Sequence, residues 1–280
     1  MAGQAQSQRR EADRGEGEFA DIIQLDRYPL HRPGSPEYRR LVEAAKSSLA
    51  ASGAFVLEGF LASSAVTGIL DQADSIAGAA FVSSQPHNVF LQPADPAFPA
   101  DHARNRLVRS EKSVLADDQI PASSLLRQLY GAECFRSFLC EVLEVEGLFP
   151  FEDPLAPINV SFYGEGEELG WHFDNSPFAV TLLLRDAEKG GAFEYVPDTR
   201  RETPEGYAAL SRILEGEAAD VRELKQGRGA LVLFKGARSL HRVTPSGGPV
   251  PRTIAILSYA PEPGRSLKEH TRLLFYGRTQ

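Results

Sequence analysis

The N-terminal half of the chain begins with alternating helical and extended patterns. Apolar residues recur every three or four positions across 36–51, which predicts an amphipathic helix. The short apolar run 54–60 then predicts a strand. A second helix is expected over 63–80, with Ser63 or Ser64 as its N-cap.

A proline-rich segment interrupts this pattern. Residues 82–105 contain four prolines together with Asn, Asp and His, a composition that breaks helices and strands. A loop this long in a compact domain is usually a lid or a substrate loop. We expect its two histidines, His87 and His102, at the surface. The pattern returns to helix over 125–145.

From Ile158 onward the pattern becomes that of strands. Short β-rich runs are separated by glycine and proline turns: INVSFYG, FAVTLLLRD, GAFEYVP, GALVLFKG and RTIAILSYA. This texture favours antiparallel strands in a sandwich or barrel, with a helix, 204–215, inserted between two of them. The predicted fold class is α+β, in one domain over 21–280: a helical layer with a lid loop (21–150) packed on a jelly-roll core (151–280).

Composition and charge narrow the choice of partners. The 280 residues are 42% hydrophobic, which is enough for a buried core. The net charge of −8 would repel the phosphate backbone of a nucleic acid, so we expect no nucleic-acid partner. Residues 1–20 are polar and are expected to be disordered. No apolar run approaches the ~20 residues of a membrane span, and the two cysteines are expected to be reduced thiols. We therefore expect a cytoplasmic protein without a membrane partner; the pattern does not indicate an oligomeric state.

The segment GWHFDNSP places two metal-competent side chains at the edge of the predicted core. In an extended chain His172 and Asp174 point to the same face, because side chains alternate with a period of two, and Phe173 points away. On its own the pair is weak evidence. A histidine can be a core residue bonded to a carbonyl, and Asp174 can cap the following turn.

A second histidine and an arginine strengthen the case. His241 follows another predicted strand, so His172, Asp174 and His241 form the two-histidine, one-carboxylate set that suits Fe(II) and leaves open positions. Arg252 begins the strand after His241. Its forked guanidinium suits the distal carboxylate of a cosubstrate such as 2-oxoglutarate, although a surface arginine is the alternative.

These motifs resemble the Fe(II)/2-oxoglutarate-dependent oxygenases over roughly residues 155–262. The resemblance is carried by NVSFYGEGEELGWHFD, GGAFEYVP and HRVTPSGGPVPRTIAILSY. It implies a double-stranded β-helix, iron bound by the three ligands, 2-oxoglutarate and O2 as cosubstrates, and Arg252 as the carboxylate clamp. By the same resemblance, Tyr163 donates a hydrogen bond to 2-oxoglutarate; a purely structural hydrogen bond is the alternative.

The segments GWHFDNSPFAVTLLL and RNRLVRSEKS are also similar to the BesD-type group of free-amino-acid halogenases and hydroxylases. That resemblance implies a small-molecule substrate, a free amino acid such as lysine or a relative. The halogenases of the group carry glycine where this chain has Asp174, so the position that would take halide is filled. The expected activity is that of an amino acid hydroxylase, with desaturation or cyclisation as other outcomes. The group's lysine-contacting residues do not obviously recur, and Leu169 is apolar where a polar contact would be expected.

Three further residues are candidates for substrate binding. By resemblance, Arg109 is expected to bind the substrate carboxylate, while a solvated surface cation is the alternative. Asn175 is expected to face the substrate's amino group. Trp171, beside His172, either packs against outer helices or forms a wall of the pocket.

Two other classes of protein remain possible on this pattern. A jelly-roll binding module without turnover would be expected to lack a ligand or the clamp, and here none is missing. A cupin-type metalloenzyme that acts without 2-oxoglutarate usually has a third or fourth histidine near the first pair, and GWHFDN offers one.

Overall fold

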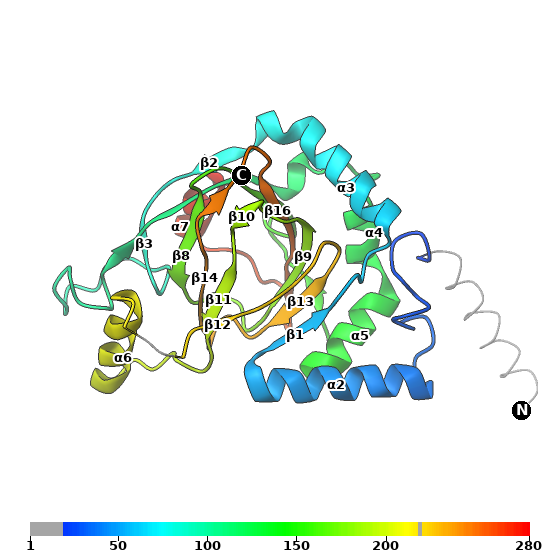
Figure 1. Cartoon of the computed structure of the whole chain (residues 1–280), viewed down its shortest axis with the longest axis horizontal. Helices are drawn as coiled ribbons and strands as arrows, with labels where there is room; N and C mark the ends of the chain where they lie inside the picture. Colours follow the sequence, from blue (N-terminus) through cyan, green and yellow to red (C-terminus); the bar gives the residue numbers. More distant parts are fainter. Residues whose placement is uncertain (1–18, 218–219) are drawn as a thin grey trace, which may run out of the picture.

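The computed structural model describes residues 19–217 and 220–280, so the predicted disordered tail lies almost entirely outside the described residues. A single curled sheet dominates the molecule (Figure 1). Its strands run in the order β1 (Ala54–Leu57), β13 (Leu231–Phe234), β9 (Ala179–Arg185), β16 (Arg252–Leu257), β7 (Ile158–Tyr163), β5 (Ser110–Leu115), β8 (Glu168–His172), β14 (Leu240–Val243), β11 (Phe193–Val196) and β12 (Arg222–Glu223). A further strand, β2 (Phe81–Ser83), pairs with β5.

The sheet folds over at β5. The first residues of this strand pair with β8, through Ser110 and Glu111, and its last residues pair with β7, through Ser113 and Leu115. All of these pairings are antiparallel. The chain therefore forms a double-stranded β-helix, as predicted, in which the larger sheet from β1 to β5 faces the smaller one from β8 to β12.

Short two-stranded ladders complete the described strands. They pair β10 (Lys189–Gly190) with β15 (Ser246–Gly247), β17 (Tyr259–Ala260) with β6 (Phe149–Pro150), and β3 (His87–Asn88) with β4 (Leu107–Val108). Strands β1, β2 and β5 come from the half of the chain that was predicted as a helical layer. That half thus contributes to the sheet as well as covering it.

Four helices cover the outer face of the larger sheet: α2 (Pro36–Ser52), α3 (Ser63–Ile76), α4 (Leu125–Gly131) and α5 (Glu133–Leu143). The predicted serine cap of α3 is wrong, because Ala62 holds the N-cap position without a side-chain hydrogen bond. The single helix predicted over 125–145 is two helices. The chain is extended at Ala132, with φ −67° and ψ 121°, which separates α4 from α5.

The smaller sheet is covered by α6 (Pro204–Leu214) and the proline-rich loop, whose apolar side chains share one cluster. The expectation that His87 lies at the surface is wrong: this histidine is buried, because β3 pairs with β4 and holds it under the loop. His102 is half-buried. The last helix, α7 (Glu269–Tyr276), packs against β2 and β5.

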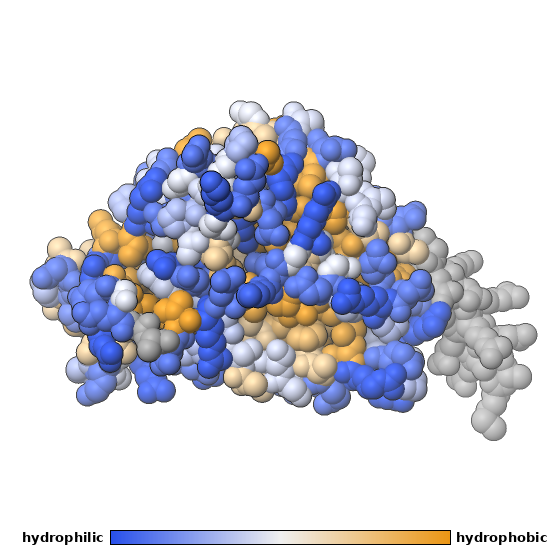
Figure 2. All heavy atoms as spheres, viewed as in Figure 1, coloured by the Kyte–Doolittle hydropathy of each residue, from blue (hydrophilic) through white to orange (hydrophobic). Residues whose placement is uncertain are grey.

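The surface agrees with this layered arrangement. Figure 2 shows hydrophilic side chains over most of the exposed helices, with hydrophobic groups visible mainly along the β1 edge above α2 and near α6. No helix among the described residues is long and apolar enough to cross a membrane.

Candidate active site

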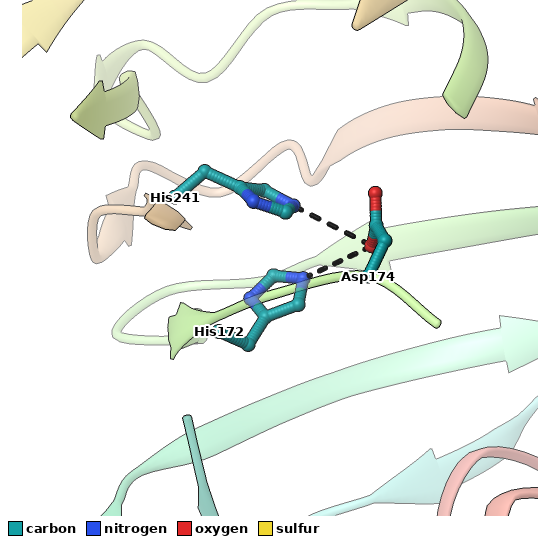
Figure 3. A group of neighbouring side chains, drawn as sticks. All are labelled: His172, Asp174 and His241. Carbon is teal, nitrogen blue, oxygen red and sulfur yellow. Dashed lines mark ion pairs between the residues drawn. The ribbon is translucent and has the colours of Figure 1, made fainter. Parts of the chain in front are cut away.

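Two neighbouring strands of the smaller sheet bring the metal-competent residues together. His172 ends β8, and His241 lies directly opposite it on β14. Asp174 follows two residues after His172, so its carboxylate turns to the same side. Its Oδ1 lies 3.6 Å from His172 Nε2 and 3.5 Å from His241 Nε2, and both imidazoles point to this one oxygen (Figure 3).

Backbone carbonyls orient both imidazoles. The Nδ1–H of His172 donates to the Gly170 carbonyl at 2.9 Å, and the Nδ1–H of His241 donates to the Ser239 carbonyl at 2.9 Å. A carbonyl accepts only from a protonated nitrogen, so each Nε2 keeps its lone pair and directs it to the centre of the site. Hydrogen bonds of this kind fix the tautomer and the ring orientation of metal-binding histidines.

Asp174 is held by an unusually close backbone contact. Its N–H donates to the Gly236 carbonyl at 3.0 Å. A Cβ at Gly236 would lie 1.8 Å from Asp174 Oδ2 and 2.6 Å from its Cγ, so only glycine leaves room for this rotamer. Burial by itself would raise the pKa of Asp174, but the two imidazoles hold that pKa below its usual range. Asp174 Oδ2 is buried and has no hydrogen-bond partner within the described residues.

A cavity of about 220 Å³ inside the curled sheet contains this site. It is lined by the three residues of the triad together with Arg252 and Tyr163. Arg252 and Tyr163 are opposite each other in register on β16 and β7, and the guanidinium carbon lies 5.6 Å from the centre of the Tyr163 ring. The structure thus brings both predicted cosubstrate residues into the same cavity as the triad.

Arg252 is the largest charged group buried in this cavity. It is 1% exposed, and its Nε and Nη1 have no hydrogen-bond partner within the described residues. Burial lowers the pKa of Arg252, although Tyr163 and Asp186 oppose the shift. Burial also raises the pKa of Tyr163 to about 12, so its hydroxyl stays protonated and is available as a donor.

A second cation in the cavity was not predicted. Lys112 lies on β5, with its Nζ 5.1 Å from the centre of the Phe275 ring and 5.9 Å from that of Tyr163. Burial lowers the pKa of Lys112 to about 8; the carboxylate of Asp174 opposes this shift and Arg252 adds to it. The sequence signal was available, since Lys112 alternates with Ser110 and Val114 along a strand, but that strand was not recognised.

A hydrogen-bond chain behind β8 was also missed. His87 Nδ1–H donates to the Asn88 carbonyl at 3.0 Å, and Ser110 Oγ–H donates to His87 Nε2 at 2.6 Å. The same Ser110 oxygen accepts from the Gly170 N–H at 2.9 Å. Gly170 is thus bonded on both sides: its N–H donates to Ser110, and its carbonyl, in the next peptide unit, orients the His172 imidazole. Burial lowers the pKa of His87 to about 4, and His172 and Lys112 add to the effect, so His87 is neutral.

Of the three residues predicted to bind substrate, one lines the cavity and two do not. The structure does not place Arg109 in the cavity: its side chain is 59% exposed, pairs with Glu111 and Glu168, and is not among the lining residues. Trp171 likewise does not line the cavity, because it points to the opposite face of β8. There it packs in the α6 cluster and lies under the Arg242 guanidinium at 4.7 Å. Asn175 does line the cavity, at an exposed position directly after Asp174.

The comparisons with known proteins agree with this geometry. Residues 101–272 match the family model described as Halogenase D. The chain belongs to the Halogenase D family. No curated protein sequence matches it.

Solved structures share its fold at low sequence identity. An oxidoreductase of the 2OG-Fe(II) oxygenase family from Burkholderia pseudomallei aligns with a TM-score of 0.51 and 14% identity, over 84% of this chain and 94% of that one. HygX from Streptomyces hygroscopicus, solved with nickel, 2-oxoglutarate and hygromycin B bound, aligns with a TM-score of 0.54 and 14% identity, over 80% and 89%. A prolyl hydroxylase from Trichoplax adhaerens, in complex with a hypoxia inducible factor peptide, gives 0.51 and 17%, over 79% and 89%. These similarities support the fold of the Halogenase D chain.

Proposed function

We propose that the protein is an Fe(II)/2-oxoglutarate-dependent oxygenase that hydroxylates an unactivated C–H bond of a compact metabolite. One observation carries this proposal. Two histidines and a carboxylate that converge on one point share a buried cavity with an arginine whose guanidinium has unpaired donors. A site that binds only a metal has no need for that arginine.

The donor set fits a divalent iron ion. One ligand atom from each of His172, Asp174 and His241 lies within 4.8 Å of the other two, so a single ion could be held by all three residues. Each imidazole uses its Nδ1 to bond a backbone carbonyl, so its Nε2 is available to an ion. The Oδ2 atom of Asp174 has no hydrogen-bond partner within the described residues and is available as well. Two imidazoles with one carboxylate form the facial set typical of non-haem Fe(II) oxygenases.

The cation end of the cavity fits the distal carboxylate of 2-oxoglutarate. Arg252 offers two unpaired donors, and its guanidinium carbon lies 5.6 Å from the centre of the ring of Tyr163, whose hydroxyl is protonated. Charge-assisted hydrogen bonds from a guanidinium to a carboxylate are strong and directional. The keto acid end of the same molecule would then extend toward the triad.

Iron and 2-oxoglutarate, when bound, supply the oxidising chemistry: one atom of O2 enters the product, the other enters succinate, and carbon dioxide leaves. The residues of the chain provide geometry. The carbonyls of Gly170 and Ser239 hold the two imidazoles, Gly236 holds Asp174, and the apolar walls of the cavity exclude water. These contacts decide which C–H bond of the substrate lies nearest the open face of the metal.

Hydroxylation is favoured over chlorination, the activity that the family's name suggests. A halide ion needs a free coordination position, and Asp174 occupies the place where the halogenases that this sequence resembles carry glycine. For the substrate we propose a free amino acid, as the resemblance implies. The buried Gln226 Oε1, which lines the cavity without a hydrogen-bond partner, supports this by offering an acceptor to an ammonium group.

The test is anaerobic reconstitution of the purified protein with Fe(II), followed by a screen of free amino acids for succinate release and product mass, in buffer containing chloride. We expect one amino acid to stimulate succinate release and to gain one oxygen atom. A product that has gained chlorine instead would show that the protein is a halogenase and that the proposed hydroxylation is wrong. The matched control is His172→Ala, and succinate formation that persists in this variant would refute the metal assignment.

A further inference from the structure

The cavity contains more positive charge than the proposed cosubstrate can compensate. Its charged lining residues among those described are Arg252, Lys112 and the carboxylate of Asp174. A divalent ion adds two positive charges, which leaves an excess of three. The 2-oxoglutarate dianion compensates two of these, so one positive charge remains without a counter-charge in the lining; Asp186, which does not line the cavity, acts on Arg252 and not on Lys112.

The cation that carries this charge is Lys112. Its Nζ has no ion pair or hydrogen bond within residues 19–217 and 220–280 and lies between the rings of Tyr163 and Phe275. Among the residues that the structure describes, Asp174 is the one carboxylate that stabilises its charge, and a metal ion would compensate that carboxylate. Arg252 differs, because Asp186 also acts on it. A half-buried ammonium without a counter-charge is costly unless a ligand supplies one.

On the basis of the proposed function, we propose that Lys112 binds a carboxylate of the primary substrate, and that this substrate has no cationic side chain. The second part follows from the lining of the cavity. Asp174 is the sole acidic residue among the described lining residues, and aromatic rings lie beside the triad, since the ring centres of Phe193 and Phe234 are 5.5 Å and 4.8 Å from that of His241. A side-chain ammonium such as that of lysine would find no carboxylate to pair with. An aliphatic side chain would bury apolar surface instead.

The first experiment measures binding to the protein loaded anaerobically with Fe(II) and 2-oxoglutarate, by calorimetry. The probes share one carbon chain: L-norleucine, L-lysine, hexanoate and hexylamine. We expect L-norleucine to bind roughly tenfold or more tightly than L-lysine, and hexanoate to bind more tightly than hexylamine. Tighter binding of L-lysine, or no binding of either carboxylate with an uncharged chain, would overturn the inference.

The second experiment compares variants of two cations that are close in sequence. Lys112→Met should weaken L-norleucine binding roughly tenfold or more while the affinity for 2-oxoglutarate stays unchanged, and Lys112→Arg should restore most of the loss. Arg109→Met removes an exposed cation outside the cavity and should change neither affinity. If Lys112→Met instead weakens 2-oxoglutarate binding, the lysine belongs to the cosubstrate site and the proposal is wrong. Should this variant fail to fold, the probe series on the unaltered protein still decides.

The two proposals fail in different ways. If the protein binds neither Fe(II) nor 2-oxoglutarate, the oxygenase assignment fails. If it binds both but prefers a substrate with a cationic side chain, only the assignment of Lys112 fails.

Discussion

The two ends of the cavity differ in how their polar groups are satisfied. At the triad end, each imidazole already donates to a backbone carbonyl, and the backbone at Gly236 holds Asp174 in place. At the other end, Arg252 has two unpaired nitrogens, and Lys112 forms no ion pair with any described residue. The triad end is therefore pre-organised, whereas the cation end is complete only with an anionic ligand. We therefore expect that substitutions at the triad and substitutions at the cations affect metal binding and anion binding separately.

Removing a ligand should have the largest effect on the pre-organised end. We expect Asp174→Ala to weaken Fe(II) binding about 100-fold or more, because loss of supporting contacts alone usually costs 10–100-fold. Anaerobic equilibrium dialysis measures this affinity. Asp198→Asn, which alters a surface carboxylate paired with Arg238, is the control and should bind iron normally. Normal iron binding by Asp174→Ala would rule out this aspartate as a ligand.

Removing the arginine should affect the opposite end alone. We expect Arg252→Met to weaken 2-oxoglutarate binding about 30-fold or more, because truncating one partner of a buried charge pair costs about 2–5 kcal/mol. Fe(II) affinity should change little. The unliganded variant should melt no lower than the unaltered protein, since the substitution removes a buried charge without a hydrogen-bonded partner. Equal losses of iron and 2-oxoglutarate would mean that the two ends are not independent.

Gly236 tests whether the triad depends on backbone packing. In Gly236→Ala the new methyl group would force Asp174 out of its present rotamer, so we expect iron affinity to fall roughly tenfold or more with little change in 2-oxoglutarate binding. Gly131→Ala is the matched control, because a Cβ there meets no atom within 4 Å. An unchanged iron affinity in Gly236→Ala would show that Asp174 has another equally good position.

The smallest expected effect concerns pH. The pKa of Lys112 falls from 10.5 to about 8 on folding, so below about pH 8 the lysine is charged in both states and the folded state carries the cost of its burial. Above about pH 10.5 it is neutral in both states and the cost is absent. The melting temperature of the unliganded protein, relative to that of Lys112→Met, should therefore rise by a few degrees between these pH values. A constant difference would mean that the ammonium is not desolvated in the fold.

The pattern of His172, Asp174, His241 and Arg252 could be recognised from the sequence because these residue types stand in or beside predicted strands and their motifs resemble those of a known family. Alternation along one strand places His172 and Asp174 on one face without any knowledge of the fold. Conversely, β5 was missed because SEKSVL is short and polar, and its inward face appears only when β7 and β8 pair with its two ends. Lys112 and the His87–Ser110 hydrogen bond were missed with it.

The same reason explains the two candidate substrate residues that lie outside the cavity. Arg109 is only three positions from Lys112, and the sequence does not separate a cation that points into the cavity from one that pairs with Glu111 and Glu168 at the surface. Trp171 is adjacent to His172, but adjacency in a strand means the opposite face. Which face is the cavity and which is covered by α6 depends on how the sheet curls.

Local hydrophobic periodicity and residue type were enough to predict the α+β class, a jelly-roll core and the metal-competent motif, and the double-stranded β-helix followed from the resemblance to a known family. Only the tertiary structure decided that the cavity has two cations and a single carboxylate, that Gly236 limits the position of Asp174, and that Arg109 lies outside. These features depend on contacts between segments far apart in the chain, so no local pattern records them.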